Sequence, residues 1–153
     1  MSAYFVLDPA AVADCDSDSR QGVIDALAAR LAKVYDLDEA QIGEALDERE
    51  KLGSTGFGRA VAIPHARVAG LKRPVCAVLR LRTPVDFAAA DGLPVDLVFG
   101  LLSPADSGAT HLHALAAISR MMRDDELRER IGEAPDCEAA YSILDSVSTR
   151  DAA

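Results

Sequence analysis

Residues 95–102, Val-Asp-Leu-Val-Phe-Gly-Leu-Leu, decide the fold. A nearly continuous apolar run of this length is typical of a strand buried on both faces, so we expect it at the centre of a sheet. Upstream, residues 75–82 predict a second strand, with the apolar odd-numbered positions on one face. A third β-like segment, residues 61–63, is followed by Pro64, which suits a strand end because proline cannot donate to a ladder.

Amphipathic segments lie on both sides of these strands in the chain. Apolar residues at helical spacing predict helices over residues 23–34, 38–51, 110–123, 124–131 and 135–144. Gly53 is expected to end the second helix, and Thr110 to cap the third. Because helices precede and follow the strands, we predict an α/β fold, a three-layer sandwich in which a mixed β-sheet is flanked by helices on both faces.

Length and composition set limits on the class of protein. A chain of 153 residues, half of them hydrophobic and 5% aromatic, predicts one domain over residues 1–153. It also excludes a disordered chain and an aromatic nucleic-acid platform. Sixteen basic against 25 acidic side chains give a net charge of −9, so we expect neither nucleic acid nor direct membrane insertion. The odd number of cysteines, three and widely spaced, favours a reducing cytoplasmic location.

The charge is unevenly distributed along the chain. Residues 59–82 contain six basic and no acidic side chains, in an otherwise acidic protein. We call these six the basic island: Arg59, Arg67, Lys72, Arg73, Arg80 and Arg82. His65 lies within it. A window chosen for its charge will sometimes lack acids by chance, so the island alone does not establish a site.

The glycine-rich loop of residues 53–58, Gly-Ser-Thr-Gly-Phe-Gly, is the first candidate site. Consecutive backbone N–H groups in such a loop, including that of Gly56, can form an anion-binding nest. Ser54 and Thr55 offer hydroxyl donors, and Arg49, one helical turn earlier, is placed to grip a phosphoryl group. The loop lacks the spacing and lysine of a Walker A motif. A helix end followed by a flexible turn is the alternative.

The histidines are the second candidate site. His111 falls on the inward stripe of its predicted helix, near the N-terminus, whereas His113 falls on the solvent side. His65 follows Pro64 at a strand end, where side chains of open α/β sheets point into ligand crevices. A neutral imidazole can attack phosphorus, so the pair could hold and transfer a phosphoryl group. His111 could instead be a core residue.

A metal site is the other reading of this pair. His65 and His111 could bind a cation together with a carboxylate such as Asp91 or Asp96. The basic island makes a cation less favourable there, and the spacing matches no standard zinc pattern. We therefore predict no metal.

Six motifs together resemble a known family. They are residues 49–50, 53–58, 61–65, 83–87, 94–99 and 111–115, in the family's order and at comparable spacing. The chain resembles the enzyme IIA components of the bacterial phosphoenolpyruvate:sugar phosphotransferase system, in the fructose/mannitol and nitrogen-regulatory branch, and is most like the nitrogen-regulatory type. The match is weakest over residues 1–20 and 146–153. Arg59-Ala60 stands where members often carry Asn-Gly.

The resemblance implies a role for each candidate residue. His65 would accept a phosphoryl group from an HPr-like phosphocarrier, and His111 would orient and stabilise that group. The phosphoryl-binding residues would be Arg49, Ser54, Thr55 and Gly56. The family implies no cofactor, and its partners would be the phosphocarrier and either regulated target proteins or a IIB domain. A sugar-specific component of the fructose/mannitol type and a non-catalytic regulatory binding module are the alternatives.

Overall fold

The computed structural model describes residues 4–152, which form five helices and six strands. In chain order these are β1 (Val6–Cys15), α1 (Arg20–Tyr35), α2 (Glu39–Leu52), β2 (Gly56–Gly58), β3 (Val61–Ala62), β4 (His65–Val68), β5 (Val75–Val85), β6 (Val95–Pro104), α3 (Ala109–Met122), α4 (Asp125–Glu133) and α5 (Cys137–Ala152). The predicted α/β class is confirmed. Over the described residues, no helix is long and apolar enough to cross a membrane.

The sheet is mixed, and β6 lies inside it as predicted. Its strand order is β1-β5-β6-β3-β2, with β5 antiparallel to β6 and β1 parallel to β5. Both β3 and β4 run parallel to β6 along its other edge, β3 beside residues 97–98 and β4 beside residues 101–104. The two short strands therefore resemble one strand interrupted at residues 63–64, immediately before His65.

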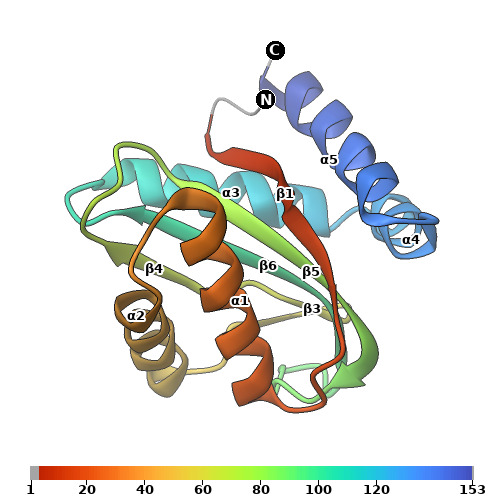
Figure 1. Ribbon diagram of the computed structural model, residues 1–153. Coiled ribbons are helices and arrows are strands. Elements are labelled where there is room, and N and C mark those ends of the chain that lie inside the picture. The colour runs from red at the N-terminus through yellow and green to blue at the C-terminus, as the bar shows by residue number, and fades with distance from the viewer. Residues whose placement is uncertain (1–3, 153) are drawn as a thin grey trace.

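Helices cover both faces of the sheet, as the three-layer prediction requires. Apolar residues of α1 and α2 pack on one face, and those of α3, α4 and α5 pack on the other (Figure 1). We call the apolar cluster under α1 and α2 the first core, and the cluster under α3, α4 and α5 the second core. The alternation predicted for β5 is confirmed, because Val75 and Ala77 join the first core whereas Cys76 and Val78 join the second core. Burial of both faces explains why β6 is mostly apolar, with Asp96 exposed and Ser103 as its one buried polar residue.

Close packing of α1 on β6 depends on Gly100. A Cβ atom at this position would lie 2.6 Å from Leu27 Cδ1, closer than a real contact allows. Glycine therefore permits α1 to approach the central strand and fixes the depth of the first core.

Four local features differ from the sequence prediction. The prediction missed β1, an edge strand whose pairing is irregular between Leu7 and Val12 around Pro9, so that no clean alternation marks it. It also missed β2 and β4, which are too short to produce a pattern. Thr110 does not cap α3, because the helix begins at Ala109 and its N-cap is Gly108, without a side-chain hydrogen bond.

Candidate active site

His65 is placed by the interruption between β3 and β4. It is the first residue of β4 and pairs with Leu101 of β6, while the carbonyl of Pro64 accepts a hydrogen bond from the Leu101 N–H. Helix α2 packs beside β4, which brings Arg49 from the last turn of α2 to the His65 ring. The short edge strand thus carries one candidate residue and positions it against a second.

The contacts of the His65 ring specify its tautomer. Its Nδ1 lies 2.8 Å from the carbonyl oxygen of Ile63, which can only accept, so Nδ1 carries the proton. Arg49 Nε donates to His65 Nε2 at 3.2 Å, so Nε2 presents its lone pair. The same guanidinium donates through Nη1 to the carbonyl of Gly53 at 2.8 Å. The exposed side of the ring is therefore a nucleophilic nitrogen facing a cation.

His111 lies beside His65, in the first turn of α3. The two ring centroids are 5.5 Å apart and the rings are inclined by 46°. His111 is only 4% exposed, as the inward stripe predicted, and its Nδ1 lies 2.6 Å from Ser103 Oγ. His113 is exposed, also as predicted. The structure thus brings His65, His111 and Arg49 together.

The glycine-rich loop lies next to this group, but its donors are turned inward. Thr55 donates through its N–H at 2.8 Å, and through its hydroxyl, to the carboxylate of Glu50, which is buried. The Ser54 hydroxyl donates to the carbonyl of Phe87 and accepts from the Gly56 N–H at 2.9 Å. The anion that the loop holds is therefore the protein's own Glu50, and the donors of Ser54, Thr55 and Gly56 are already used.

A surface cavity of about 400 Å³ opens at the two histidines. Its lining is Ala45, Glu48, Arg49, Leu52, His65, Ala66, Arg67, His111, Leu112 and Leu115. Ser54, Thr55 and Gly56 do not belong to it. Leu52 is 85% exposed and Leu112 is 61% exposed, so the rim of the cavity combines apolar side chains with the cations of Arg49 and Arg67.

Residues 7–147 match the family described as phosphoenolpyruvate-dependent sugar phosphotransferase system, EIIA 2. The chain is 45% identical over 127 residues to a nitrogen regulatory protein of Pseudomonas aeruginosa, with 82% of each chain covered. It is 34% identical over 137 residues to a fructose-specific EIIABC component of Bacillus subtilis, covering 89% of this chain and 21% of that protein. The crystal structure of the nitrogen regulatory protein IIA-Ntr of Neisseria meningitidis superposes with a TM-score of 0.84 at 36% identity, covering 91% of this chain and 96% of that one.

The chain belongs to the enzyme IIA family. Phosphotransfer through a histidine is the activity of this family in general, so the environment of each histidine in this enzyme IIA matters. Burial lowers the pKa of His65, and the Arg49 guanidinium lowers it further, against the opposing effect of the hydrogen bond to Ile63. Burial lowers the pKa of His111 to about 4, with Arg67 and His65 adding to the shift. Both rings are therefore neutral at pH 7.

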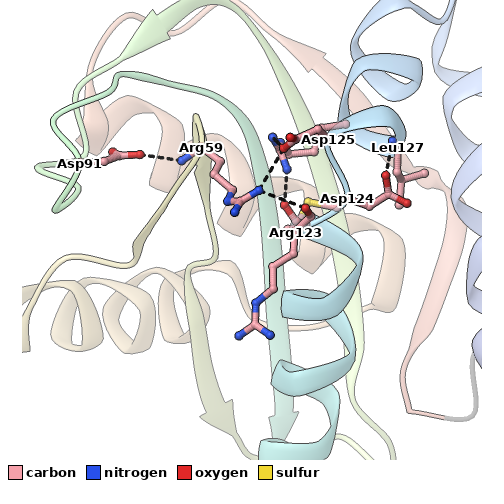
Figure 2. A network of polar contacts seen from close by, with 8 residues as sticks. Arg59, Asp91, Arg123, Asp124, Asp125 and Leu127 are labelled. Atoms are coloured by element: carbon pink, nitrogen blue, oxygen red, sulfur yellow. Dashed lines mark hydrogen bonds and ion pairs between the residues drawn. The ribbon is translucent and has the colours of Figure 1, made fainter.

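Members of the basic island of this enzyme IIA lie in different places. Arg67 lines the histidine cavity, whereas Arg59, Arg80 and Arg82 form ion pairs elsewhere with Asp125, Asp14 and Asp16. Figure 2 shows Arg59 reaching Asp125 and the carbonyl of Arg123, with its own N–H bonded to Asp91. Sequence proximity to His65 therefore does not place a cation at the site.

The carboxylates considered for a metal site do not join the histidines. Asp91 accepts from the N–H groups of Arg59 and Leu93, at 2.8 and 3.1 Å, and does not line the cavity at the histidines. Asp96 lies near Arg59 in a different cavity. Among the residues that the structure describes, no group of three or more histidine, cysteine or acidic side chains could hold a metal ion.

Two residues of this site, Glu50 and Ser103, were not identified from the sequence. Glu50 lies beside Arg49 in a motif that the family resemblance already used, but nothing local indicates that it turns into the loop. Ser103 has a usable signal, because period-two spacing from Leu97 through Leu101 places it on the sheet face that α3 covers.

Proposed function

We propose that this enzyme IIA is a phosphohistidine relay in which Nε2 of His65 accepts a phosphoryl group from an HPr-like phosphocarrier. The observation that carries the proposal is that His65 Nε2 accepts from Arg49, while Nδ1 is bonded to the carbonyl of Ile63 and the neutral ring of His111 lies beside the His65 ring. A lone pair directed at a cation is the arrangement that an incoming anionic phosphoryl group can use.

The transfer balances without movement of a proton. The Nε2 lone pair of His65 forms the new bond to phosphorus, the bond between phosphorus and the carrier's donor atom breaks, and its electron pair remains with the carrier. Nδ1 keeps its proton, which stays bonded to the carbonyl of Ile63. As the phosphoryl group arrives, the Arg49 guanidinium exchanges its contact with Nε2 for contacts with phosphoryl oxygens, which gain a bidentate cation.

The remaining predicted site residues have different parts in this proposal. His111 is the second active-site residue and orients the phosphoryl group. Ser54, Thr55 and Gly56, predicted to bind it, support the site by holding the loop closed, Thr55 through Glu50 and Ser54 through Gly56 and the carbonyl of Phe87. Arg67, which lines the cavity and is exposed, adds positive potential at its mouth.

We further propose a nitrogen-regulatory role, in which the phosphorylation state of His65 selects the regulated partner proteins. The similarity to nitrogen regulatory proteins over most of their length supports this role. A cytoplasmic location is part of the proposal, and three free cysteines fit a reducing compartment. A sugar-specific component that passes phosphate to a IIB domain is the second candidate, supported by the fructose-specific relative.

One assay tests the activity and the branch together. The protein is incubated with phosphoenolpyruvate, enzyme I and either a sugar-type or a nitrogen-type phosphocarrier, and the adduct is followed by mass spectrometry. We expect an acid-labile phosphoryl adduct in the wild type and none in His65→Ala, with the nitrogen-type carrier reacting faster. Retention of the adduct in His65→Ala would refute the relay, and faster transfer from the sugar-type carrier would favour the second candidate.

A further inference from the structure

The polar residues that are buried as a whole form two pairs. Among the residues with described burial, these are Glu50, Thr55, Ser103 and His111. Glu50 is paired with Thr55, and Ser103 with His111. Ser103 has no exposed surface, and it is the penultimate residue of β6, where its partner across the sheet is Arg67. A fully buried hydroxyl in a strand that is otherwise almost entirely apolar needs a physical explanation.

The hydrogen of the Ser103 hydroxyl decides the tautomer of His111. Ser103 Oγ lies 2.6 Å from His111 Nδ1, which is its only hydrogen-bond partner among the described residues. If Nδ1 donated to this oxygen, the hydroxyl hydrogen would be buried without an acceptor, at a cost of about 1–3 kcal/mol. If the hydroxyl donates to Nδ1, no donor is left unpaired. The favoured state therefore has the lone pair on Nδ1 and the proton on Nε2 of His111.

The Nε2–H of His111 is then the donor on the cavity side. The two nitrogens of an imidazole point in nearly opposite directions, so a ring with Nδ1 against Ser103 directs Nε2 away from the core. His65 lies on that side, with the ring centroids 5.5 Å apart, and both rings line the same cavity. A phosphoryl group on His65 would meet an N–H donor here, whereas the other tautomer would present a lone pair to its oxygens.

The Ser103 hydrogen bond matters because the His111 ring is neutral. A doubly protonated ring would donate from Nε2 whatever its partner at Nδ1, but the pKa of His111 lies well below neutral pH, so only one nitrogen carries a proton. No capping side chain of α3 competes for the ring, because the N-cap is Gly108. Ser103 is thus the polar contact that orients the ring.

We propose that Ser103 is a positioning residue, whose hydroxyl donates to Nδ1 of His111 and so presents Nε2–H to a phosphoryl group on His65. This inference rests on the proposed function for its consequence, but the hydrogen bond itself does not. Ser103 acts through His111 and does not touch the reacting atoms. The proposal therefore has a spectroscopic test, made on unphosphorylated protein, and a kinetic one.

The spectroscopic test records two-bond proton–nitrogen correlations of the histidine rings at pH 7, on protein carrying nitrogen-15 in its histidines. We expect a protonated Nε2 on His111 and an unprotonated Nδ1 whose resonance is shifted by an accepted hydrogen bond. That shift should disappear in Ser103→Ala and persist in Ser103→Thr, which keeps the hydroxyl. A protonated Nδ1 in the wild type, or an Nδ1 resonance unchanged in Ser103→Ala, would overturn the proposal.

The kinetic test compares phosphorylation rates with the phosphocarrier under the same conditions. We expect Ser103→Ala to be about tenfold slower, the worth of one hydrogen bond, and Ser103→Thr to recover most of the rate. Ser107→Ala is the matched control, since the Ser107 hydroxyl is buried nearby without a hydrogen-bond partner in the described structure. Equal rates for Ser103→Ala and wild type would overturn the proposal.

Failure of the proposed function is distinguishable from failure of this inference. If the wild-type protein is never phosphorylated, the relay is refuted, while the spectra still establish or reject the Ser103 hydrogen bond. Thermal unfolding of Ser103→Ala and Ser107→Ala checks that neither variant is merely unfolded. A slow Ser103→Ala variant whose Ser103→Thr counterpart is equally slow would indicate a packing defect and count against the proposal.

Discussion

The two ends of helix α3 treat basic side chains in opposite ways. Near its C-terminus, Arg59 donates to Asp125 at 3.0 Å and to the Arg123 carbonyl (Figure 2). Arg128 donates to the same Asp125. Near its N-terminus, Arg49 donates to the neutral ring of His65 and to a carbonyl. Within residues 4–147, neither Arg49 nor Arg67 forms an ion pair with a carboxylate.

The two ends therefore differ in whether their arginines are free to bind an anion from outside the chain. At the Arg59 end the positive charges are balanced by the chain's own carboxylates, so an anion from outside would have to displace them. At the His65 end Arg49 donates to the neutral ring of His65 and to the carbonyl of Gly53, so an anionic phosphoryl group could bind it without displacing a paired carboxylate. A basic stretch of sequence therefore indicates an anion site only where the fold leaves its cations unbalanced.

Replacing the arginine at each end of α3 should give the largest difference in phosphorylation rate between the two ends. Arg49→Ala should slow phosphorylation of His65 by about 10²–10³-fold, because it removes a preorganised cation from the developing charge. Arg59→Ala, the matched control at the other end, should leave the rate unchanged. Phosphorylation rates with the same carrier measure both, and Arg49→Lys should fall between, since it keeps the charge but loses the fork. Equal effects of the two alanine variants would contradict the distinction.

Acid pH should act differently on the two ends of α3, because His111 at one end becomes protonated while Asp125 at the other stays ionised. The pKa of His111 is about 4 in the folded protein against 6.5 ordinarily, so its contribution to stability is complete above about pH 6.5 and is lost as pH falls towards 4. The lost stability should reach about 3 kcal/mol. At the other end, hydrogen bonding to Arg128 lowers the pKa of Asp125, so its ion pairs persist through this range.

Urea unfolding of wild type and His111→Gln between pH 7 and 4 measures this effect. The variant should lose less stability than the wild type over the interval, because glutamine does not titrate. His65, whose pKa is also lowered, acts in the same direction and remains in both proteins. Identical pH dependence in the two proteins would mean that His111 does not titrate as described.

Removing the charge of Glu50 tests whether the loop beside His65 holds an internal anion. Glu50→Gln keeps the shape of the side chain but loses a charged acceptor for the N–H and hydroxyl of Thr55. We expect a loss of about 2 kcal/mol in the free energy of unfolding, the worth of hydrogen bonds to a charged group. Urea unfolding measures it, with Glu48→Gln as the exposed control in the same helix turn. An unchanged stability in Glu50→Gln would contradict the role of its carboxylate.

Much of the fold could be predicted because periodicity reports burial. The alternation in β5 and the apolar run of β6 identified the middle of the sheet, and helical spacing identified the layers on either side. Strand β1 escaped because an edge strand with Pro9 at its irregular pairing need not alternate. Strand β4 escaped because its four residues are set by pairing with β6 rather than by their own composition.

The site was less predictable than the fold, because no local pattern in the sequence indicates which side chains will form hydrogen bonds with each other. Family resemblance indicated His65, His111 and Arg49, and the structure places them in contact. The sequence does not show that the donors of Thr55 bind Glu50, or that the Ser54 hydroxyl binds the carbonyl of Phe87. Ser103 lies just beyond the predicted strand of residues 95–102, and its role depends on an α3 residue eight positions later.

The smallest expected effect concerns the turn that holds Arg59 at its end of α3. Arg59 and Ala60 form the two-residue turn between β2 and β3 with φ of 59° and 66°, a conformation that favours glycine or asparagine. Ala60→Gly should therefore stabilise the protein by about 0.5–1 kcal/mol and leave the phosphorylation rate unchanged. Ala105→Gly, at an exposed position without positive φ, should not stabilise. Urea unfolding measures both. Destabilisation by Ala60→Gly would mean that the turn is not strained, so that holding Arg59 in place requires no unfavourable backbone conformation.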